Sequence, residues 1–290
     1  MSCTSRLFVP SSICSAVFAA CLVAGADAST PVVATATYSV NGEAPTTVNI
    51  TGTLTPSGNY SFVKTITVGQ YKFTFNYAAD VNPVNNALIN GSSTVENNSS
   101  APIDVTTSFT APICPHLNGS SNIGGLCTIK LICNGDGGAI LCSGDVDYLV
   151  SAIIDDVPAQ NLFYCPFVMA KTGSGSTTTN TQWGTPIPSA VGPSYVGSLG
   201  HTTHFTMTPG DKAVFSLLFA TNGTIDDPLA DPCPGDVDGN GVVDKDDLMI
   251  VLSLFGQSVS CGTQADTDGN GLIDGSDVNA VISYWGECPG

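Results

Sequence analysis

Oxygen-bearing side chains recur at fixed spacing near the C-terminal end of the sequence. Positions 1, 3, 5, 9 and 12 of a loop that starts at residue 236 are Asp236, Asp238, Asn240, Asp244 and Asp247. Carboxylate and amide oxygens held close together suit a hard cation, and Ca²⁺ takes about six to eight of them at about 2.3–2.6 Å. Mg²⁺ requires a tighter octahedron and fits this spacing less well. The pattern therefore predicts a calcium-binding loop.

The loop is repeated 30 residues later, with 10 identical residues in 23 aligned positions. The second set of side chains consists of Asp266, Asp268, Asn270, Asp274 and Asp277. At position 7, Val242 and Leu272 are expected to contribute backbone carbonyl oxygens, and a glycine at position 6 allows the sharp turn before them. Two complete copies in register are improbable by accident, so we predict two bound calcium ions.

Each loop continues into apolar residues at the helical spacing i, i+3, i+4, i+7. They are Leu248, Val251, Leu252 and Phe255 in the first copy, and Val278, Val281, Ile282 and Trp285 in the second. Gly256 and Gly286 are expected to end the two helices. No helix is expected before either loop, because prolines precede the first and polar residues precede the second.

A duplicated loop–helix unit without entering helices resembles the type I dockerin module, and the resemblance covers about residues 232–288. It implies an EF-hand-like, calcium-stabilised docking domain whose helices are related by pseudo-twofold symmetry and bind a cohesin-like partner. In that family, partner choice depends on loop positions 10 and 11. Here they are Lys245-Asp246 and Gly275-Ser276, which differ from each other and argue against two equivalent binding modes. Thrombospondin-type acidic repeats are a lower-ranked alternative, because they lack the apolar helix.

The negative charge of the chain is concentrated in this same region. Of the formal net charge of −17, residues 226–287 contribute −12 through 13 acidic residues and one lysine. Binding to nucleic acid needs clustered Lys and Arg, so this balance argues against a nucleic-acid partner. The charge is explained locally, by metal ligands.

The N-terminal residues have the features of an export signal. Arg6 precedes a mostly apolar run, Leu7–Val23, and Ala26-Asp27-Ala28 is a small-residue cleavage pattern. A transmembrane anchor is the alternative, but the run is shorter than the ~20 residues a span needs. A lipoprotein attached through Cys21 is a second, weaker alternative. We therefore expect a secreted protein, extracellular or at the cell surface, without a membrane span.

Eight cysteines remain after residue 28, and an even number in an oxidising compartment predicts disulfides. A strong turn at residues 134–138 favours a bridge between Cys133 and Cys142. In the twofold unit that the dockerin resemblance implies, the ends come close together, which favours a bridge between Cys233 and Cys288. Cys261 is then left for the sandwich or for a partner. The sequence alone does not determine the connectivity.

Residues 29–225 show the alternation of β-strands. Four aromatic residues lie on one face of a predicted strand: Tyr71, Phe73, Phe75 and Tyr77. Similar runs are Val32–Val40, Thr47–Leu54, Asp104–Thr110, Val146–Ile154, Leu162–Met169 and Ala213–Thr221. Turn residues separate them, which predicts an antiparallel sandwich of roughly eight to twelve strands. Residues 173–176 and the threonines after them are expected to form a flexible loop.

The predicted fold is mainly β: an antiparallel β-sandwich followed by a small all-α, dockerin-like calcium-binding domain. The expected organisation is a signal peptide at 1–28, the sandwich at 29–225, a linker at 226–234 and the calcium domain at 235–290.

Candidates for catalysis in the sandwich are few, and we predict no catalytic residues. Strand alternation places His201 and His204 on opposite faces, and Asp155-Asp156 occupy a turn before a proline. Trp183, Tyr195 and Tyr60 are the candidates for sugar binding in the sandwich, and packing over the ends of the core is the favoured interpretation of the same residues. We therefore expect a secreted, non-catalytic surface or assembly protein. The alternative is a carbohydrate-binding or polysaccharide-degrading component, with a glycan on the sandwich.

Overall fold

The computed structural model describes residues 32–57, 59–80, 86–143, 146–225, 233, 235–257, 259, 263–267 and 272–288. The predicted signal peptide and nearly all of the predicted linker lie outside these residues. The described residues form two hydrophobic cores, one among strands β1–β15 and one in a C-terminal unit at residues 233–288. The predicted class, a mainly β sandwich followed by a small helical unit, is confirmed.

One sheet of the sandwich has the strand order β2-β1-β7-β14-β9-β10, and every pairing is antiparallel. The strands are β2 (Thr46–Thr51), β1 (Val33–Val40), the first half of β7 (Ile103–Cys133), β14 (Tyr195–Met207), β9 (Tyr148–Ile154) and β10 (Val157–Tyr164). The short strands β8 (Gly138–Cys142) and β11 (Val168–Lys171) extend it beside the end of β14.

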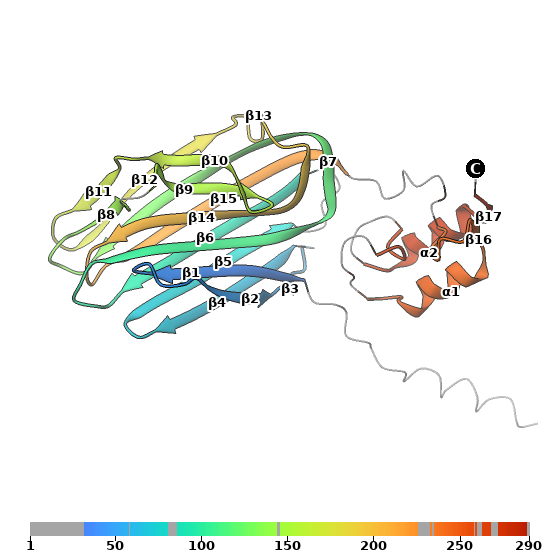
Figure 1. Cartoon of the computed structure of the whole chain (residues 1–290), viewed down its shortest axis with the longest axis horizontal. Coiled ribbons are helices and arrows are strands. Elements are labelled where there is room, and N and C mark those ends of the chain that lie inside the picture. The colour runs from blue at the N-terminus through green and yellow to red at the C-terminus, as the bar shows by residue number, and fades with distance from the viewer. Residues whose placement is uncertain are drawn as a thin grey trace, which may run out of the picture.

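The other sheet has the order β3-β4-β5-β6-β15-β7, and the end of β7 also pairs with β12 and β13. Its strands are β3 (Thr53–Leu54), β4 (Tyr60–Val68), β5 (Tyr71–Asp80), β6 (Asn86–Asn97), β15 (Lys212–Ile225), β12 (Gly175–Trp183) and β13 (Ala190–Val191). Strand β7 belongs to both sheets and curves from one to the other at one end of the sandwich (Figure 1).

Aromatic rings from the two sheets meet in the core. The ring of Tyr77 on β5 stacks on Phe109 of β7 with a centroid distance of 4.0 Å. Phe205 of β14 and Phe215 of β15 make a second contact at 4.7 Å. These rings are almost completely buried, as the alternation of residues 71–77 predicts for that strand. Burial of such large apolar rings is the main contribution to the stability of the sandwich.

Several boundaries differ from the prediction. The described sandwich has fifteen strands, more than the eight to twelve expected. The predicted run Leu162–Met169 is divided between β10 and β11, because the chain turns at Cys165-Pro166. Residues 175–183 form strand β12 and not a flexible loop, because every residue of β12 pairs with the last part of β7. Sequence composition alone does not reveal that partner.

Two histidines of β14 point to opposite faces, as predicted. His201 lies in the core, where its Nε2 is 3.1 Å from the Tyr77 hydroxyl and 3.2 Å from Ser93 Oγ. Burial lowers the pKa of His201 to about 4. His204 is partly exposed, with its Nε2 3.1 Å from Asp104 Oδ1. The two rings therefore do not form one metal or catalytic site.

The predicted bridge between Cys133 and Cys142 is wrong. Cys142 pairs with Cys165, and Cys133 is a free, buried thiol, as is Cys127. The turn at residues 134–138 is present, but β8 pairs with β11 and β14, which brings Cys165 to Cys142. The predicted bridge between Cys233 and Cys288 is confirmed.

Burial should make the two free thiols inert in the native protein. Cys127 is 1% exposed, and burial raises the pKa of its thiol to about 12, so almost no thiolate is present at neutral pH. We expect iodoacetamide to label Cys127 and Cys133 in urea but hardly at all in buffer, with labelling measured peptide by peptide by mass spectrometry. Equal labelling in both conditions would contradict the buried positions.

The C-terminal unit contains helices α1 (Lys245–Ser253) and α2 (Gly275–Ser283), and a short ladder between β16 (Val242–Val243) and β17 (Gly286–Glu287). Val243, Val251, Ile273 and Val281 are fully buried at its centre. Within the described part of the chain, no helix is long and apolar enough to cross a membrane.

Candidate calcium site

Three carboxylates of the first loop converge as the spacing predicts. One carboxylate oxygen each from Asp236, Asp238 and Asp247 can be chosen so that all three lie within 4.8 Å of one another. Like charges this close repel unless a cation lies between them. The donors are all oxygens, which suits a hard cation such as Ca²⁺ better than a metal that prefers nitrogen or sulfur.

Asp247 is the most deeply placed of these groups. It is fully buried, and its Oδ1 accepts hydrogen bonds from the backbone N–H groups of Val237 (2.7 Å) and Asp238 (3.0 Å). Its Oδ2 accepts from Asp244 N–H at 2.8 Å. Asp244 is the N-cap of α1, and its carboxylate in turn accepts from Asp246 N–H at 2.7 Å. The start of the helix therefore holds the twelfth-position carboxylate against the first half of the loop.

Backbone N–H groups also orient the side chains at positions 1, 3 and 5. Asp236 accepts from Asn240 N–H at 3.0 Å and from Gly241 N–H at 2.8 Å. Asp238 accepts from Asn240 N–H at 3.1 Å, and Asn240 Oδ1 accepts from Val242 N–H at 2.8 Å. Gly241 has φ of 88°, a conformation that favours glycine. The loop backbone therefore holds the side-chain oxygens at these three positions in place, and the lone pairs of those oxygens that accept no hydrogen bond can bind a cation.

The second loop repeats this arrangement where it is described. Asp277 is fully buried, with Oδ1 accepting from Thr267 N–H at 2.7 Å and Oδ2 from Asp274 N–H at 2.7 Å. Asp274 is the N-cap of α2. Of the other predicted ligands, Asp266 at position 1 is buried and Leu272 at position 7 is exposed. Asp268 and Asn270 lie outside the described residues. Thr267 Oγ1 adds a further bond to Asp277 at 3.1 Å, which the ligand spacing does not indicate.

Matching backbone contacts join the two halves of the unit. Gly256 N–H donates to the carbonyl of Ile273 at 2.7 Å, and Ile273 N–H donates to that of Gln257 at 2.9 Å. In the repeat, Val243 corresponds to Ile273 and Gly286 corresponds to Gly256, and Val243 likewise pairs with Gly286. The pseudo-twofold relation that the repeat predicts is therefore present in the hydrogen bonds.

The predicted apolar faces of the helices are only partly buried. Val251 and Val281 are in the core, but Leu252, Phe255, Ile282 and Trp285 are each about half exposed. The helices end at Ser253 and Ser283, so Phe255 and Trp285 lie beyond them. The four apolar positions that the sequence assigns to each helix are therefore not all buried. Each half of the unit instead presents an aliphatic and an aromatic side chain to solvent.

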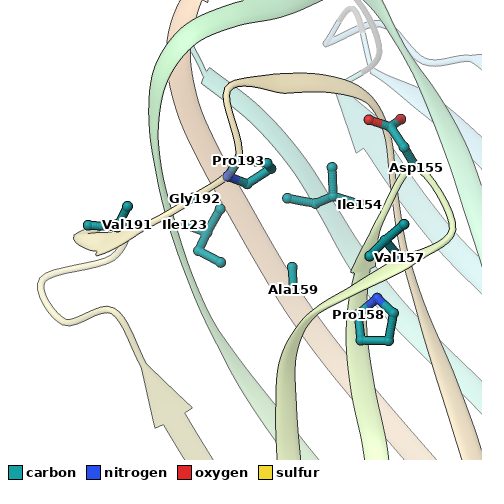
Figure 2. Close-up of a pocket in the computed structure, with 9 residues that line it drawn as sticks. All are labelled: Ile123, Ile154, Asp155, Val157, Pro158, Ala159, Val191, Gly192 and Pro193. Atoms are coloured by element: carbon teal, nitrogen blue, oxygen red, sulfur yellow. The ribbon is translucent and has the colours of Figure 1, made fainter.

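The sandwich offers a less distinct site. A hollow of about 380 Å³ lies between the β9–β10 turn and residues 191–193, with Ile123 and Ile154 at its base (Figure 2). Asp155 is the one charged residue among the described residues that line it. Its carboxylate accepts hydrogen bonds from Gly197 N–H at 3.0 Å and from Ser198 Oγ at 3.2 Å. The lining is otherwise apolar, which does not suit a sugar.

The predicted aromatic sugar contacts are not arranged as a binding surface. Trp183 and Tyr60 are buried, and the side chain of Tyr195 lies outside the described residues. Trp183 packs against Gly125 of β7, where a Cβ atom would lie 2.2 Å from the indole ring. This burial agrees with the packing interpretation for Trp183 and Tyr60.

Comparison with known protein families gives a match at the C-terminal end of the chain. Residues 234–285 match the family described as the type I dockerin domain. No curated protein matches the chain. The matched segment begins just before Asp236 and ends at Trp285, so it contains both loops and both helices.

Proposed function

We propose, from the premise that the C-terminal unit is a type I dockerin domain, that the chain is a secreted, non-catalytic surface or assembly protein held by this domain. Dockerin domains bind calcium and dock onto cohesin-type proteins. The sandwich is then the part that is displayed. The observation that carries this proposal is the coincidence of the dockerin match with two loops whose acidic side chains share one hydrogen-bond pattern.

Calcium would be held in the first loop by Asp236, Asp238, Asn240, Asp244 and Asp247, with the carbonyl of Val242. The corresponding set in the second loop is Asp266, Asp268, Asn270, Leu272, Asp274 and Asp277, giving two ions in all. The bound cation would neutralise carboxylates that otherwise repel one another, so that metal binding contributes to folding of this small core.

Partner docking would use the apolar side chains that the folded unit leaves exposed. Phe255 and Trp285 occupy equivalent positions in the repeat, each three residues after an exposed aliphatic residue, Leu252 or Ile282. Aromatic residues surrounded by aliphatic ones commonly contribute most of the energy of a protein–protein interface. The flanking pairs Lys245-Asp246 and Gly275-Ser276 differ in charge, so the two halves should not serve one partner equally.

Export is supported by the signal-like N-terminal sequence and by two disulfides, which persist in oxidising compartments. A non-catalytic sandwich is supported by the positions of its ionisable groups. His201 is enclosed in the core, and Asp155 is engaged by backbone and hydroxyl donors at a hairpin turn.

The proposal is tested by measuring binding of the full chain to a panel of purified cohesin domains. Each measurement is made with calcium and again with excess EGTA. We expect binding to at least one domain only with calcium. We also expect Phe255→Ser or Trp285→Ser to weaken it by roughly 30-fold, with unequal losses. Val63→Ser, at an exposed position on the sandwich, is the matched control. Calcium-independent binding, or no effect of either aromatic substitution, would argue against this docking surface.

A further inference from the structure

The two halves of the calcium unit differ in how they are closed. Between α1 and the second loop the polypeptide is continuous, so residue 258, after α1, is joined to Thr263, before the loop, by the sequence itself. Shifted by 30 residues, these two positions become Cys288, after α2, and Cys233, before the first loop. Cys233 and Cys288 form a disulfide. The disulfide thus replaces the missing chain connection and makes the unit covalently closed.

This disulfide is in direct contact with the first loop. Sγ of Cys288 lies 3.6 Å from Oδ2 of Asp236, the ligand at position 1. The backbone N–H of Cys288 donates to the carbonyl of Gly241 at position 6 (3.1 Å), and Asp236 N–H donates to the carbonyl of Cys233 (3.2 Å). Residues just before Cys288 pair with positions 7 and 8 through β17 and β16. Both half-cystines therefore contact the backbone from which the loop's ligands extend.

The second loop has the same backbone contact, with Thr263 at the position that Cys233 occupies before the first loop. Asp266 N–H donates to the carbonyl of Thr263 at 2.9 Å, as Asp236 does to Cys233. The second loop therefore serves as an internal comparison for the first. A crosslink between residues 55 positions apart restricts the ends of the unit in the absence of metal, when the carboxylates repel one another.

We propose that the Cys233–Cys288 disulfide is a positioning element that raises the calcium affinity of the first loop, and that its reduction weakens calcium binding at that loop selectively. A dithiol reductant breaks the S–S bond by two exchange steps. It leaves thiols on Cys233 and Cys288 and is itself oxidised to a cyclic disulfide. The inference rests on the proposed calcium ligands but not on docking to a cohesin.

Calorimetric Ca²⁺ titration of the full chain tests it, with each loop measured alone. Asp277→Asn leaves the first loop to be measured, and Asp247→Asn leaves the second. In the Asp277→Asn background, replacing both Cys233 and Cys288 by serine is expected to raise the first-loop Kd by about 10-fold or more, as loss of a supporting contact to a ligand does. In the Asp247→Asn background, the same pair should leave the second-loop Kd unchanged. The control is Cys142→Ser with Cys165→Ser, which removes the sandwich disulfide.

Helix content by circular dichroism at saturating Ca²⁺ separates this effect from misfolding, and the parent chain treated with dithiothreitol should show the same loss as the serine pair. An unchanged first-loop Kd, or an equal loss in both loops, would overturn the inference. Failure of the serine variant to regain helix content with calcium would also overturn it, because the disulfide would then maintain the fold. Absence of calcium binding in the parent chain would instead contradict the proposed ligand sets.

Discussion

Asp247→Asn is expected to abolish calcium binding at the first loop and to destabilise the C-terminal unit. The carboxylate is fully buried and accepts three backbone N–H groups, from Val237, Asp238 and Asp244. An asparagine can keep one acceptor oxygen, but its NH₂ group would then face an N–H donor. Hydrogen bonds to a charged group are worth about 1.5–3 kcal/mol each, so we expect a loss of about 3 kcal/mol or more in the free energy of unfolding.

The measurement is calcium titration together with thermal unfolding followed by helix content. Asp246→Asn is the matched control, because Asp246 is the adjacent carboxylate in sequence but is exposed and contacts only Lys245 among the described side chains. It should leave calcium affinity and stability nearly unchanged. If Asp247→Asn retained the affinity of the parent at the first loop, the twelfth position would not be a ligand there.

Acidification is expected to destabilise the sandwich through His201. The folded state holds the pKa of His201 at about 4, below its ordinary value of 6.5, so the unfolded chain binds more protons between these two values. Stability contributed by the neutral, buried ring is therefore complete above pH 6.5 and is lost as the pH falls. The slope reaches about 1.4 kcal/mol per pH unit, and the total loss near pH 4 is about 3 kcal/mol.

The dependence of stability on pH is measured by urea unfolding at pH 7 and at pH 5, with calcium in excess. Unfolding is followed by the circular dichroism of the sheet. His201→Gln can still hydrogen-bond to Tyr77 and Ser93 but does not titrate, so the part of the slope due to this residue should disappear. The same substitution at His204, on the outer face, is the control. A slope that persists in His201→Gln would assign the acid sensitivity to other groups.

The calcium loops could be predicted because all the ligands of a site lie within twelve residues. Their spacing alone brings Asp236 and Asp247 together, and the helix after them holds the last one. The β-sandwich class was predictable for the same reason, since alternation is local to each strand. Features that depend on contacts between distant segments were not predictable. The extent of β7 depends on partners in two sheets, and the burial of Trp183 depends on Gly125.

The incorrectly predicted disulfide between Cys133 and Cys142 also shows that local sequence patterns are predictable and contacts between distant segments are not. The turn between Cys133 and Cys142, which favours a bridge between them, is real. The thiol of Cys142 is nevertheless brought to Cys165 by the pairing of β8 with β11. The exposure of Phe255 and Trp285 has a similar origin, because helical spacing does not reveal that the helices end two residues earlier.

The position of β15 would have a mechanical consequence under the proposed function, in which the chain is held by its C-terminal unit. This strand is the last of the sandwich, and the C-terminal unit follows it in the sequence. It is not an edge strand: β6 pairs with it from Lys212 to Asn222, and β7 pairs with it from Lys212 to Ile225. A pull on the docking unit would load β15 along its axis, and the hydrogen bonds on both sides would share the force. Such shear geometry resists extension better than strand-by-strand peeling from an edge.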